Sequence, residues 1–331
     1  MDLFENKVIL ITGGTGSFGK ACVEKLLKKH DPKAIRIFSR DELKQWEMRQ
    51  QFSDNPKLRF FIGDVRDSER LKRAIEGVDF VIHAAALKQV PACEYNPIEA
   101  VKTNVNGAIN VINACLDNNV EKVIALSTDK AANPINMYGA TKLCSDRLFA
   151  QSNSYQGPNR HTKFSVVRYG NVMGSRGSVI PLFNEQKKNK VLTLTNENMT
   201  RFWITIPKAV DFVLESFEIM QGGELFVPKI PSMKLVDLAR AIAPRAKIKI
   251  IGLRPGEKIH EDLLTKEESN RTFELGDRYI VFSDSLDGWK DKINLYKGIK
   301  PVDEDFNYNS LGNENYLTID QMKKILKKND L

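Results

Sequence analysis

The sequence predicts an α/β protein in which a doubly wound parallel sheet is followed by a smaller C-terminal domain. From residue 7 to residue 169, short apolar runs rich in β-branched residues alternate with segments of helical spacing. This alternation is typical of parallel strands joined by right-handed helical crossovers. After residue 170 the alternation ends, and glycines, a proline and short strand patterns follow. A chain of 331 residues is also long for a single core, which favours two domains.

The composition excludes several classes of protein. With 42% hydrophobic and 28% charged residues, the chain is globular rather than disordered. No apolar run reaches the roughly 18 residues that a membrane span requires, and the N-terminal residues lack the features of a signal peptide, so we expect a cytoplasmic protein. The four cysteines have no metal-ligand spacing, and we therefore expect no metal site. The net charge of +8 favours an anionic small molecule, while no zinc finger or basic–aromatic pattern indicates nucleic-acid binding.

The first predicted strand, residues 7–12, runs directly into a glycine-rich turn and then into a helix pattern at residues 21–29. The turn has the spacing G-x-x-G-x-x-G. Glycine permits a tight turn and lets backbone N–H groups reach a pyrophosphate at the helix N-terminus. Because the motif lies between a strand and a helix, it predicts dinucleotide binding. The residues of this turn expected to contact the cofactor are Gly13, Thr15, Gly16, Ser17, Phe18 and Gly19.

The second strand, residues 34–39, ends at the position that selects between the two nicotinamide dinucleotides. An acidic residue here binds the ribose 2′-hydroxyl of NAD, whereas an arginine accommodates the 2′-phosphate of NADP. Ser39, Arg40 and Lys44 favour NADP. Asp41 lies one residue too late for the usual NAD contact, and it keeps NAD open as an alternative.

The third and fourth strands, at residues 60–63 and 80–86, supply the rest of the expected cofactor surface. The third strand leads into an Asp-Val pair placed to meet the adenine. The fourth ends in small residues beside which a cofactor can lie, and a helix over residues 99–118 follows. The cofactor residues expected from this part are Asp64, Val65, Ala84, Ala86, Lys88 and Asn104.

The fifth strand, residues 122–126, places Thr128, Asp129 and Lys130 at a strand end, where open α/β sheets bind ligands. Tyr138 and Lys142 follow with helical spacing, so they share one helix face. A nearby ammonium lowers the pKa of a phenol from its reference value of about 10. Tyr138 can then take a proton from a sugar hydroxyl while hydride leaves the same carbon. Taken alone, the pair is more typical of a surface tyrosine with an incidental lysine, and the glycine turn favours the catalytic interpretation.

A sixth strand at residues 164–169 completes the predicted nucleotide-binding domain, residues 1–170. A strand at 200–206 and a helix at 207–220 are expected to return to this domain, which residues 201–222 would therefore rejoin. Residues 171–331 are expected to form mainly a substrate-binding domain and a C-terminal segment. That part contains another strand–helix pair, at 224–228 and 233–243, and a charged loop at 254–258.

With the glycine turn, the Asp-Val pair, the three alanines and the Tyr-x-x-x-Lys motif in this order, residues 7 to about 265 resemble the extended short-chain dehydrogenase/reductases. Residues 127–134 read Ser-Thr-Asp-Lys-Ala-Ala-Asn-Pro, where Ser-Thr-Asp-Glu is more common. Together with the motifs at 39–44, 168–171, 201–204 and 254–258, this run resembles the inverting UDP-N-acetylglucosamine 4,6-dehydratases. The resemblance implies a Rossmann sheet, tightly bound and recycled NADP, and a homo-oligomer, often a hexamer. It also implies UDP-N-acetylglucosamine as the substrate and a role in pseudaminic acid biosynthesis for flagellin glycosylation.

The resemblance also implies roles for individual residues. Tyr138 would take the C4 hydroxyl proton, Lys130 would remove the C5 hydrogen, and Asp129 would protonate the C6 hydroxyl. Thr128 would bond the C4 oxygen, and Lys142 would bind the nicotinamide ribose. A basic Lys130 must be neutral, and we expect burial, nearby cations and the oxidised nicotinamide to lower its pKa. The alternative for Asp129 and Lys130 is a simple surface ion pair.

The family pattern adds Val172 to the cofactor contacts and supplies a set of substrate contacts. Arginine suits a pyrophosphate because a guanidinium binds phosphate oxygens in bidentate fashion. The substrate residues implied are Lys88, Asn171, Ser178, Val179, Ile180, Pro181, Thr195, Arg254 and Glu257.

Two other functions remain open at this point. One is a nucleotide-sugar epimerase of the same family, acting at C4 or C5. A C4 epimerase has no use for a base at C5, whereas a C5 epimerase shares most of the expected site. The other is a non-catalytic NADP-binding sensor, which need not retain Tyr138, Lys142 and residues 128–130 together.

Overall fold

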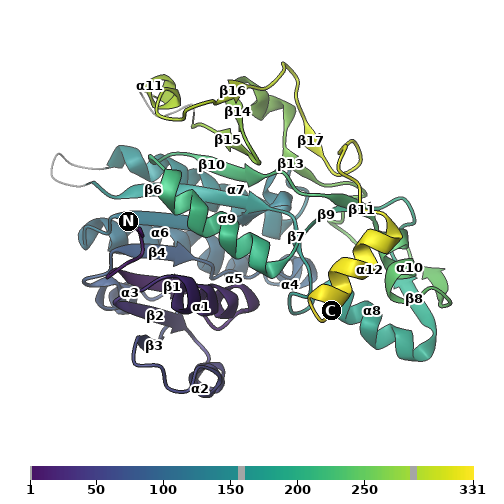
Figure 1. Ribbon diagram of the computed structural model, residues 1–331, viewed down its shortest axis with the longest axis horizontal. Coiled ribbons are helices and arrows are strands. Elements are labelled where there is room, and N and C mark those ends of the chain that lie inside the picture. Colours follow the sequence, from purple (N-terminus) through teal and green to yellow (C-terminus); the bar gives the residue numbers. More distant parts are fainter. Residues whose placement is uncertain (1, 156–160, 284–288) are drawn as a thin grey trace.

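A twisted sheet runs through the centre of the computed structural model, which describes residues 2–155, 161–283 and 289–331 (Figure 1). Within these residues the sheet has ten strands in the order β16-β14-β15-β10-β6-β5-β4-β1-β2-β3. From β10 to β3 all neighbours are parallel, and β15, β14 and β16 add an antiparallel edge. The predicted α/β fold with a doubly wound parallel sheet is confirmed.

The sheet and its covering helices have the following bounds. The strands are β1 Val8–Thr12, β2 Ala34–Ser39, β3 Leu58–Ile62, β4 Phe80–His83, β5 Lys122–Thr128, β6 Lys163–Tyr169, β10 Leu225–Pro228, β14 Thr272–Leu275, β15 Arg278–Val281 and β16 Lys300–Pro301. The helices are α1 Ser17–Lys29, α2 Glu42–Gln51, α3 Ser68–Ile75, α4 Val90–Tyr95, α5 Pro97–Val101, α6 Gly107–Asp117, α7 Met137–Gln151 and α9 Ile206–Ile219.

Strand order explains where a ligand can bind. The chain builds β1, β2 and β3 outward in one direction and then returns to place β4 on the other side of β1. The loops after β1 and β4 therefore leave the sheet in opposite directions, and a crevice opens between them at the carboxyl ends of the strands. The strands around this point are almost fully buried, which explains their near-continuous apolar sequences.

Most of the remaining elements gather at one end of the molecule, around α8, α10 and α12 (Figure 1). Their bounds are β7 Asn171–Val172, α8 Val179–Gln186, β8 Val191–Leu194, β9 Thr200–Ile204, β11 Ser232–Lys234, α10 Leu235–Ile242, β12 Lys247–Ile250, β13 Asp262–Leu264, α11 Trp289–Ile293, β17 Tyr308–Asn309 and α12 Ile319–Lys328. Of these, α11, β13 and β17 lie on the side of the large sheet in Figure 1. The described residues include no helix with both the length and the apolar character to cross a membrane.

Two hydrophobic clusters underlie these two parts. The larger one lies around the sheet, and the smaller one joins α8, α10 and α12 to β8. They meet along β9, where Phe202 belongs to the larger cluster and its neighbour Trp203 to the smaller. The helix α9 packs beside α1, as expected for a segment that returns to the first domain. The division of the chain into domains at residue 170 stays a prediction.

Two details differ from the sequence-based expectations. The strand at 224–228 was expected in the second part, but β10 pairs in parallel with β6 and extends the large sheet. The helix expected at 99–118 is interrupted by a π-helical turn, Lys102–Asn106, between α5 and α6. Such turns are rare and often occur at functional sites. Here the turn brings Asn104 into the interior.

Candidate active site

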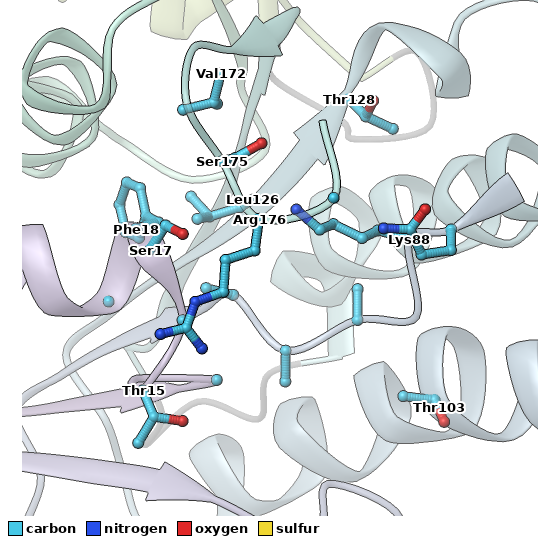
Figure 2. Close-up of a pocket in the computed structure, with 18 of the residues that line it drawn as sticks. Thr15, Ser17, Phe18, Lys88, Thr103, Leu126, Thr128, Val172, Ser175 and Arg176 are labelled. Atoms are coloured by element: carbon cyan, nitrogen blue, oxygen red, sulfur yellow. The ribbon is translucent and has the colours of Figure 1, made fainter. Parts of the chain in front are cut away.

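A cleft of about 620 Å³ lies at the carboxyl ends of the parallel strands. Its walls come from the glycine turn after β1, the ends of β2 and β3, the loop after β4, the end of β5, the start of α7 and the loop after β6 (Figure 2). Segments far apart in sequence therefore share one cavity. The predicted residues that line it are Gly13, Thr15, Gly16, Ser17, Phe18, Gly19, Ser39, Arg40, Asp41, Lys44, Asp64, Val65, Ala84, Ala86, Lys88, Thr128, Asp129, Lys130, Tyr138, Lys142, Asn171, Val172 and Ser178.

The glycine turn leaves room for a phosphate group because side chains cannot be accommodated there. Gly13 has a φ of +66°, and a Cβ at this position would lie 3.0 Å from the backbone of Ala85. A Cβ at Gly19 would lie 2.3 Å from the carbonyl oxygen of Gly14. The helix α1 begins directly after this turn, with Gly16 at its N-cap. The turn thus presents backbone amides and the positive end of a helix dipole, which fit a dinucleotide pyrophosphate.

Three charged residues, Arg40, Asp41 and Lys44, lie just after the end of β2. The carboxylate of Asp41 accepts a hydrogen bond from the backbone amide of Lys44 at 3.0 Å and pairs with Lys44 Nζ at 2.5 Å. Asp41 is therefore the N-cap of α2. Arg40 keeps more than half of its side chain exposed, 3.9 Å from Asp64. The hydroxyl of Ser39 accepts a hydrogen bond from Gln45, a residue that the sequence analysis did not identify.

One predicted cofactor residue, Asn104, lies behind the cleft rather than in its wall. Its side chain accepts a hydrogen bond from the amide of Leu87 at 2.8 Å and donates one to the carbonyl of Leu87 at 2.9 Å. It also donates to Thr141 on α7. Asn104 therefore holds the loop after β4 against α7, and its predicted contact with the cofactor stays a prediction.

The end of β5 turns sharply into a short 3₁₀ helix, Asp129–Ala131. Thr128 donates a hydrogen bond to Asp129 Oδ1 at 2.9 Å, and Lys130 Nζ donates to the same oxygen at 2.8 Å. Asp129 is fully buried, and its Oδ2 accepts no hydrogen bond from the described residues. A surface ion pair is therefore the wrong description. The turn also brings the two side chains together, although neighbours on an extended strand would point apart.

The helix α7 brings the second pair of catalytic candidates to the same place. Asn136 caps α7 by accepting a hydrogen bond from the amide of Gly139 at 2.7 Å. Tyr138 and Lys142 then line the cleft one helical turn apart. Lys142 is only 3% exposed.

The electrostatics of these groups differ from the expectation for Lys130. Burial lowers the pKa of Lys130, but the carboxylates of Asp129 and Glu261 outweigh this effect, and the net pKa is raised. Burial raises the pKa of Tyr138 to about 12, against the opposing effects of Thr128 and Lys130. Burial lowers the pKa of Lys142. The two carboxylates therefore favour the ammonium form of Lys130, and the lowered pKa predicted from the sequence is wrong for this arrangement of protein groups.

Several residues that the sequence analysis did not identify also line the cleft. The loop after β6 contributes Ser175 and Arg176, and the loop after β4 contributes Gln89. Figure 2 shows Arg176 extending across the cleft towards the side of Thr15. The glycines on either side of Arg176, in the sequence Gly-Ser-Arg-Gly at 174–177, were a signal of an unusual backbone, since Gly174 and Gly177 both have positive φ.

The remaining predicted substrate residues lie outside the cleft wall. Val179, Ile180 and Pro181 form the first turn of α8, with Ile180 buried in the smaller hydrophobic cluster. Thr195 donates a hydrogen bond to the sulfur of Met199 at 3.1 Å. Arg254 is exposed, and its backbone amide donates to Glu257 at 3.2 Å.

The chain is similar to several known proteins over most of its length. A family model described as polysaccharide biosynthesis protein matches residues 9–283. The UDP-N-acetylglucosamine 4,6-dehydratase (inverting) of Campylobacter jejuni is 54% identical over 94% of this chain and 89% of its own length. The UDP-glucose 4-epimerase of Rickettsia conorii is 48% identical over 86% of this chain and 85% of its own. The X-ray structure of Pen from Bacillus thuringiensis has 39% identity and a TM-score of 0.91, with 99% of both chains covered.

Proposed function

The chain belongs to the polysaccharide biosynthesis protein family, within the extended short-chain dehydrogenase/reductases, and we propose that it is a lyase that dehydrates UDP-N-acetylglucosamine. The reaction removes water across C5 and C6 after oxidation at C4, and it inverts C5. The product is UDP-2-acetamido-2,6-dideoxy-β-L-arabino-hexos-4-ulose. The inverting dehydratase of Campylobacter jejuni, with 54% identity, supports this reaction.

The observation that carries the proposal is the partly buried contact of 2.8 Å between Lys130 Nζ and the buried Asp129 Oδ1, in the same cleft as Tyr138. Oxidation of the C4 hydroxyl needs a proton acceptor such as Tyr138. Dehydration also needs a base at C5 and an acid at the C6 hydroxyl. Lys130 and Asp129 can supply these two functions. When one proton moves from Lys130 to Asp129, Lys130 becomes an amine that can act as the base and Asp129 becomes a carboxylic acid.

The cofactor is a nicotinamide dinucleotide, and we propose NADP in particular. When bound in the cleft, it would supply the acceptor for the C4 hydride and the donor of the hydride that reaches C6. The glycine turn would hold its pyrophosphate, and Asp64, Val65 and the alanines after β4 would lie along its adenosine and nicotinamide portions. Arg40 and Lys44 would meet the 2′-phosphate. Asp41 favours NAD less than its sequence position indicated, because its carboxylate caps α2 and pairs with Lys44.

The first chemical step uses the groups on β5 and α7. Tyr138 takes the proton of the C4 hydroxyl, and Thr128 donates a hydrogen bond to the C4 oxygen. Thr128 and Lys130 favour the phenolate form of Tyr138 against the effect of burial, and Lys142 would bind the nicotinamide ribose. The ketone formed at C4 acidifies the C5 hydrogen, which prepares the elimination.

The elimination uses the Lys130–Asp129 pair. Lys130, as an amine, removes the C5 proton, and Asp129, as a carboxylic acid, protonates the departing C6 hydroxyl so that water leaves. The pair ends as an ammonium and a carboxylate, the charged forms that make the ion pair between Lys130 Nζ and Asp129 Oδ1. One proton transfer along the 2.8 Å hydrogen bond restores the amine and the acid. C5 then receives a proton on the opposite face, which inverts it.

The substrate would lie against the other wall of the cleft. Lys88 and Asn171 would contact the sugar and its phosphates, and Ser178 with the first turn of α8 would bind further along the nucleotide. Thr195, Arg254 and Glu257 would complete the uridine diphosphate site. The pathway to pseudaminic acid for flagellin glycosylation and a homo-oligomeric state, a hexamer in particular, remain proposals from the family resemblance.

The test is NMR of UDP-N-acetylglucosamine incubated with the protein in D₂O without added cofactor. A new C6 methyl signal, deuterium at C5 and an inverted C5 centre are the expected result. They would establish dehydration, a cofactor that stays bound and internal return of the hydride together. An unchanged sugar, even with NADP supplied, would contradict the proposal.

An epimerase is the second candidate, because the Rickettsia relative at 48% identity is named as a UDP-glucose 4-epimerase. A 4-epimerase returns hydride to C4, so it would give a C4 epimer and no C6 methyl signal. The same NMR experiment with UDP-glucose and UDP-N-acetylglucosamine distinguishes the two reactions. A C5 epimerase would exchange the C5 hydrogen with deuterium and leave C6 hydroxylated.

A further inference from the structure

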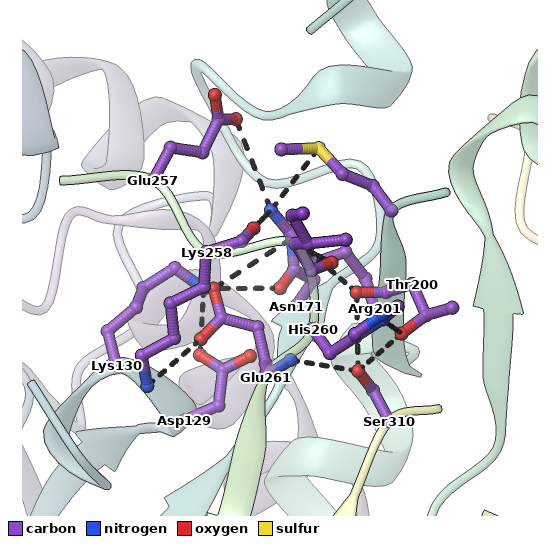
Figure 3. A network of polar contacts seen from close by, with 12 residues as sticks. Asp129, Lys130, Asn171, Thr200, Arg201, Glu257, Lys258, His260, Glu261 and Ser310 are labelled. Atoms are coloured by element: carbon purple, nitrogen blue, oxygen red, sulfur yellow. Dashed lines mark hydrogen bonds and ion pairs between the residues drawn. The ribbon is translucent and has the colours of Figure 1, made fainter. Parts of the chain in front are cut away.

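A buried carboxylate that the sequence analysis did not identify lies beside the proposed C5 base. Glu261 directly precedes β13 and is 2% exposed. Its Oε1 lies 3.5 Å from Lys130 Nζ. The backbone of Glu261 is fixed from both sides by Ser310, whose amide donates to the Glu261 carbonyl at 2.8 Å and whose hydroxyl accepts from the Glu261 amide at 2.9 Å. Figure 3 shows this carboxylate at the centre of a polar network.

Three cations from three different segments surround this carboxylate. Lys130 approaches from the end of β5. Arg201, on β9, places its Nε 3.9 Å from Glu261 Oε1, and Lys258 places its Nζ 3.7 Å from Glu261 Oε2. Arg201 is itself fixed by hydrogen bonds to backbone carbonyls, including that of Lys258 at 2.8 Å. The Glu261 carboxylate thus occupies a defined position.

Burying the Glu261 carboxylate is unfavourable for the free energy of folding. Transferring a carboxylate from water into a protein interior carries a desolvation penalty, and apolar replacements of buried ion pairs are often equally stable. Glu261 Oε2 also accepts no hydrogen bond from the described residues. Fold stability alone therefore gives a poor account of a glutamate at this place.

We propose that Glu261 is a positioning residue that holds the Lys130 side chain beside Asp129 and in line with C5 of the sugar. The proposal rests on the proposed function, in which Lys130 is the base. Lys130 has a long flexible side chain, and three groups around its Nζ define its position: Asp129 at 2.8 Å, Asn171 at 3.4 Å and Glu261 at 3.5 Å. During the elimination Asp129 changes its protonation state, whereas Glu261 keeps its charge and its position.

The charges around Lys130 determine how a change at Glu261 alters the pH dependence. The groups that face or adjoin Lys130 are Asp129 on its own turn, Glu261 before β13, Asn171 on β7, Arg201 on β9, Lys258 in the preceding loop and Tyr138 on α7. The negative charge of Glu261 contributes to the raised pKa of Lys130. Removing this charge lets Lys130 lose its proton at lower pH, and removing the positive charge of Lys258 has the opposite effect.

The main variant is Glu261→Gln, which keeps the shape and removes the charge. We expect kcat to fall by about tenfold to a hundredfold, since a displacement of about 1 Å can cost about 10²-fold. The basic limb of the pH profile of kcat should move to lower pH by about one unit or more. In a single turnover, reduced nicotinamide should form at the normal rate and then accumulate, because C4 oxidation uses Tyr138 and only the elimination is slowed.

Three further variants of the chain make the test specific. Glu261→Asp keeps the charge and should retain the pH profile with a smaller loss of kcat. Lys258→Met should move the basic limb to higher pH, opposite to Glu261→Gln. Glu267→Gln, at an exposed position six residues further on, is the matched control and should behave as the unmodified protein. Wild-type turnover is measured first, so that failure of the proposed function is recognised separately.

A second readout does not require turnover. Acylation of Lys130 by acetic anhydride, followed by mass spectrometry across a pH series, should shift to lower pH in Glu261→Gln and to higher pH in Lys258→Met. An unchanged pH dependence of Lys130 in both variants would overturn the inference, whether or not the sugar is converted. Equal slowing of C4 oxidation and elimination without a shift of the pH profile would reduce Glu261 to a structural residue. If Glu261→Gln does not fold, Glu261→Asp and Lys258→Met carry the test.

Discussion

Replacing Lys130 by methionine should separate the first half of the reaction from the second. Lys130→Met keeps a side chain of similar length but removes the amine that takes the C5 proton. A general base commonly contributes about 10²–10⁴-fold to a rate, and elimination should slow by a factor in this range. Oxidation at C4 depends on Tyr138 and should continue.

The cost in stability follows from the contacts that Lys130 makes. Its Nζ contacts Asp129 at 2.8 Å and Glu261 at 3.5 Å, and both carboxylates are buried. Removing one partner of a buried ion pair costs about 3–5 kcal/mol. Arg201 and Lys258 remain within 4.0 Å of Glu261, so the loss falls mainly on Asp129. We therefore expect a decrease of about 3 kcal/mol in the free energy of unfolding, at the lower end of that range.

The assay is a single turnover monitored through the near-ultraviolet absorbance of reduced nicotinamide, with NMR in D₂O for the sugar. Lys130→Met should give a rise in absorbance without the decay, and no deuterium at C5. Urea unfolding measures the change in stability, and Lys187→Met on the exposed turn after α8 is the control. Full turnover, or C5 exchange at the normal rate, would remove Lys130 from the mechanism.

Three further predictions concern the cofactor site and the fold. Arg40→Ala should raise the Kd of NADP more than that of NAD, and equal effects in calorimetric titrations would refute the proposed 2′-phosphate contact. Gly19→Ala would bring a Cβ to 2.3 Å from the carbonyl oxygen of Gly14, so the turn must shift and the protein should be purified without its bound cofactor; full retention would contradict this. The pKa of Glu268 is lowered from 4.5 because Arg168 at 3.0 Å outweighs the effect of burial. A carboxylate whose pKa is lowered in the folded state stabilises the fold at pH values above its normal pKa, and this contribution is lost as the pH falls through the folded-state pKa. Glu268→Gln should therefore lower the free energy of unfolding by about 3 kcal/mol near neutral pH and by less in acid. Urea unfolding at the two pH values measures this difference. A penalty independent of pH would refute the assignment of this stability to the ion pair.

Much of the fold could be read from local sequence. The β-branched apolar runs at β1, β2, β5 and β6 predicted buried parallel strands, because each run is short and buried on both faces. The glycine turn was predictable for a similar reason, since the conformation at Gly13 and the crowding at Gly19 exclude other side chains. Helical spacing puts Tyr138 and Lys142 on one face, and the glycine turn was the signal that favoured a catalytic interpretation of the pair.

Other features depend on contacts between distant segments. The strand β10 lies in the large sheet because it pairs with β6, and nothing in its own residues indicates that partner. Asn104 was expected at the cofactor, but a π-helical turn directs it to Leu87. Backbone hydrogen bonding within a helix depends on how the helix packs, and a helical sequence pattern does not record it.

The charge of Lys130 illustrates the same limit at the catalytic centre. The family resemblance identified it as a candidate base, and burial, nearby cations and the oxidised nicotinamide were expected to lower its pKa. In the folded chain Glu261 comes within 3.5 Å of its ammonium, and together with Asp129 it raises the pKa. The sequence by itself therefore determined the central parallel strands, the glycine turn and the candidates for the reacting groups, because these follow from local spacing and side-chain type. The tertiary structure alone decided which charges face one another, because electrostatic interactions depend on distance in space and on exclusion of water.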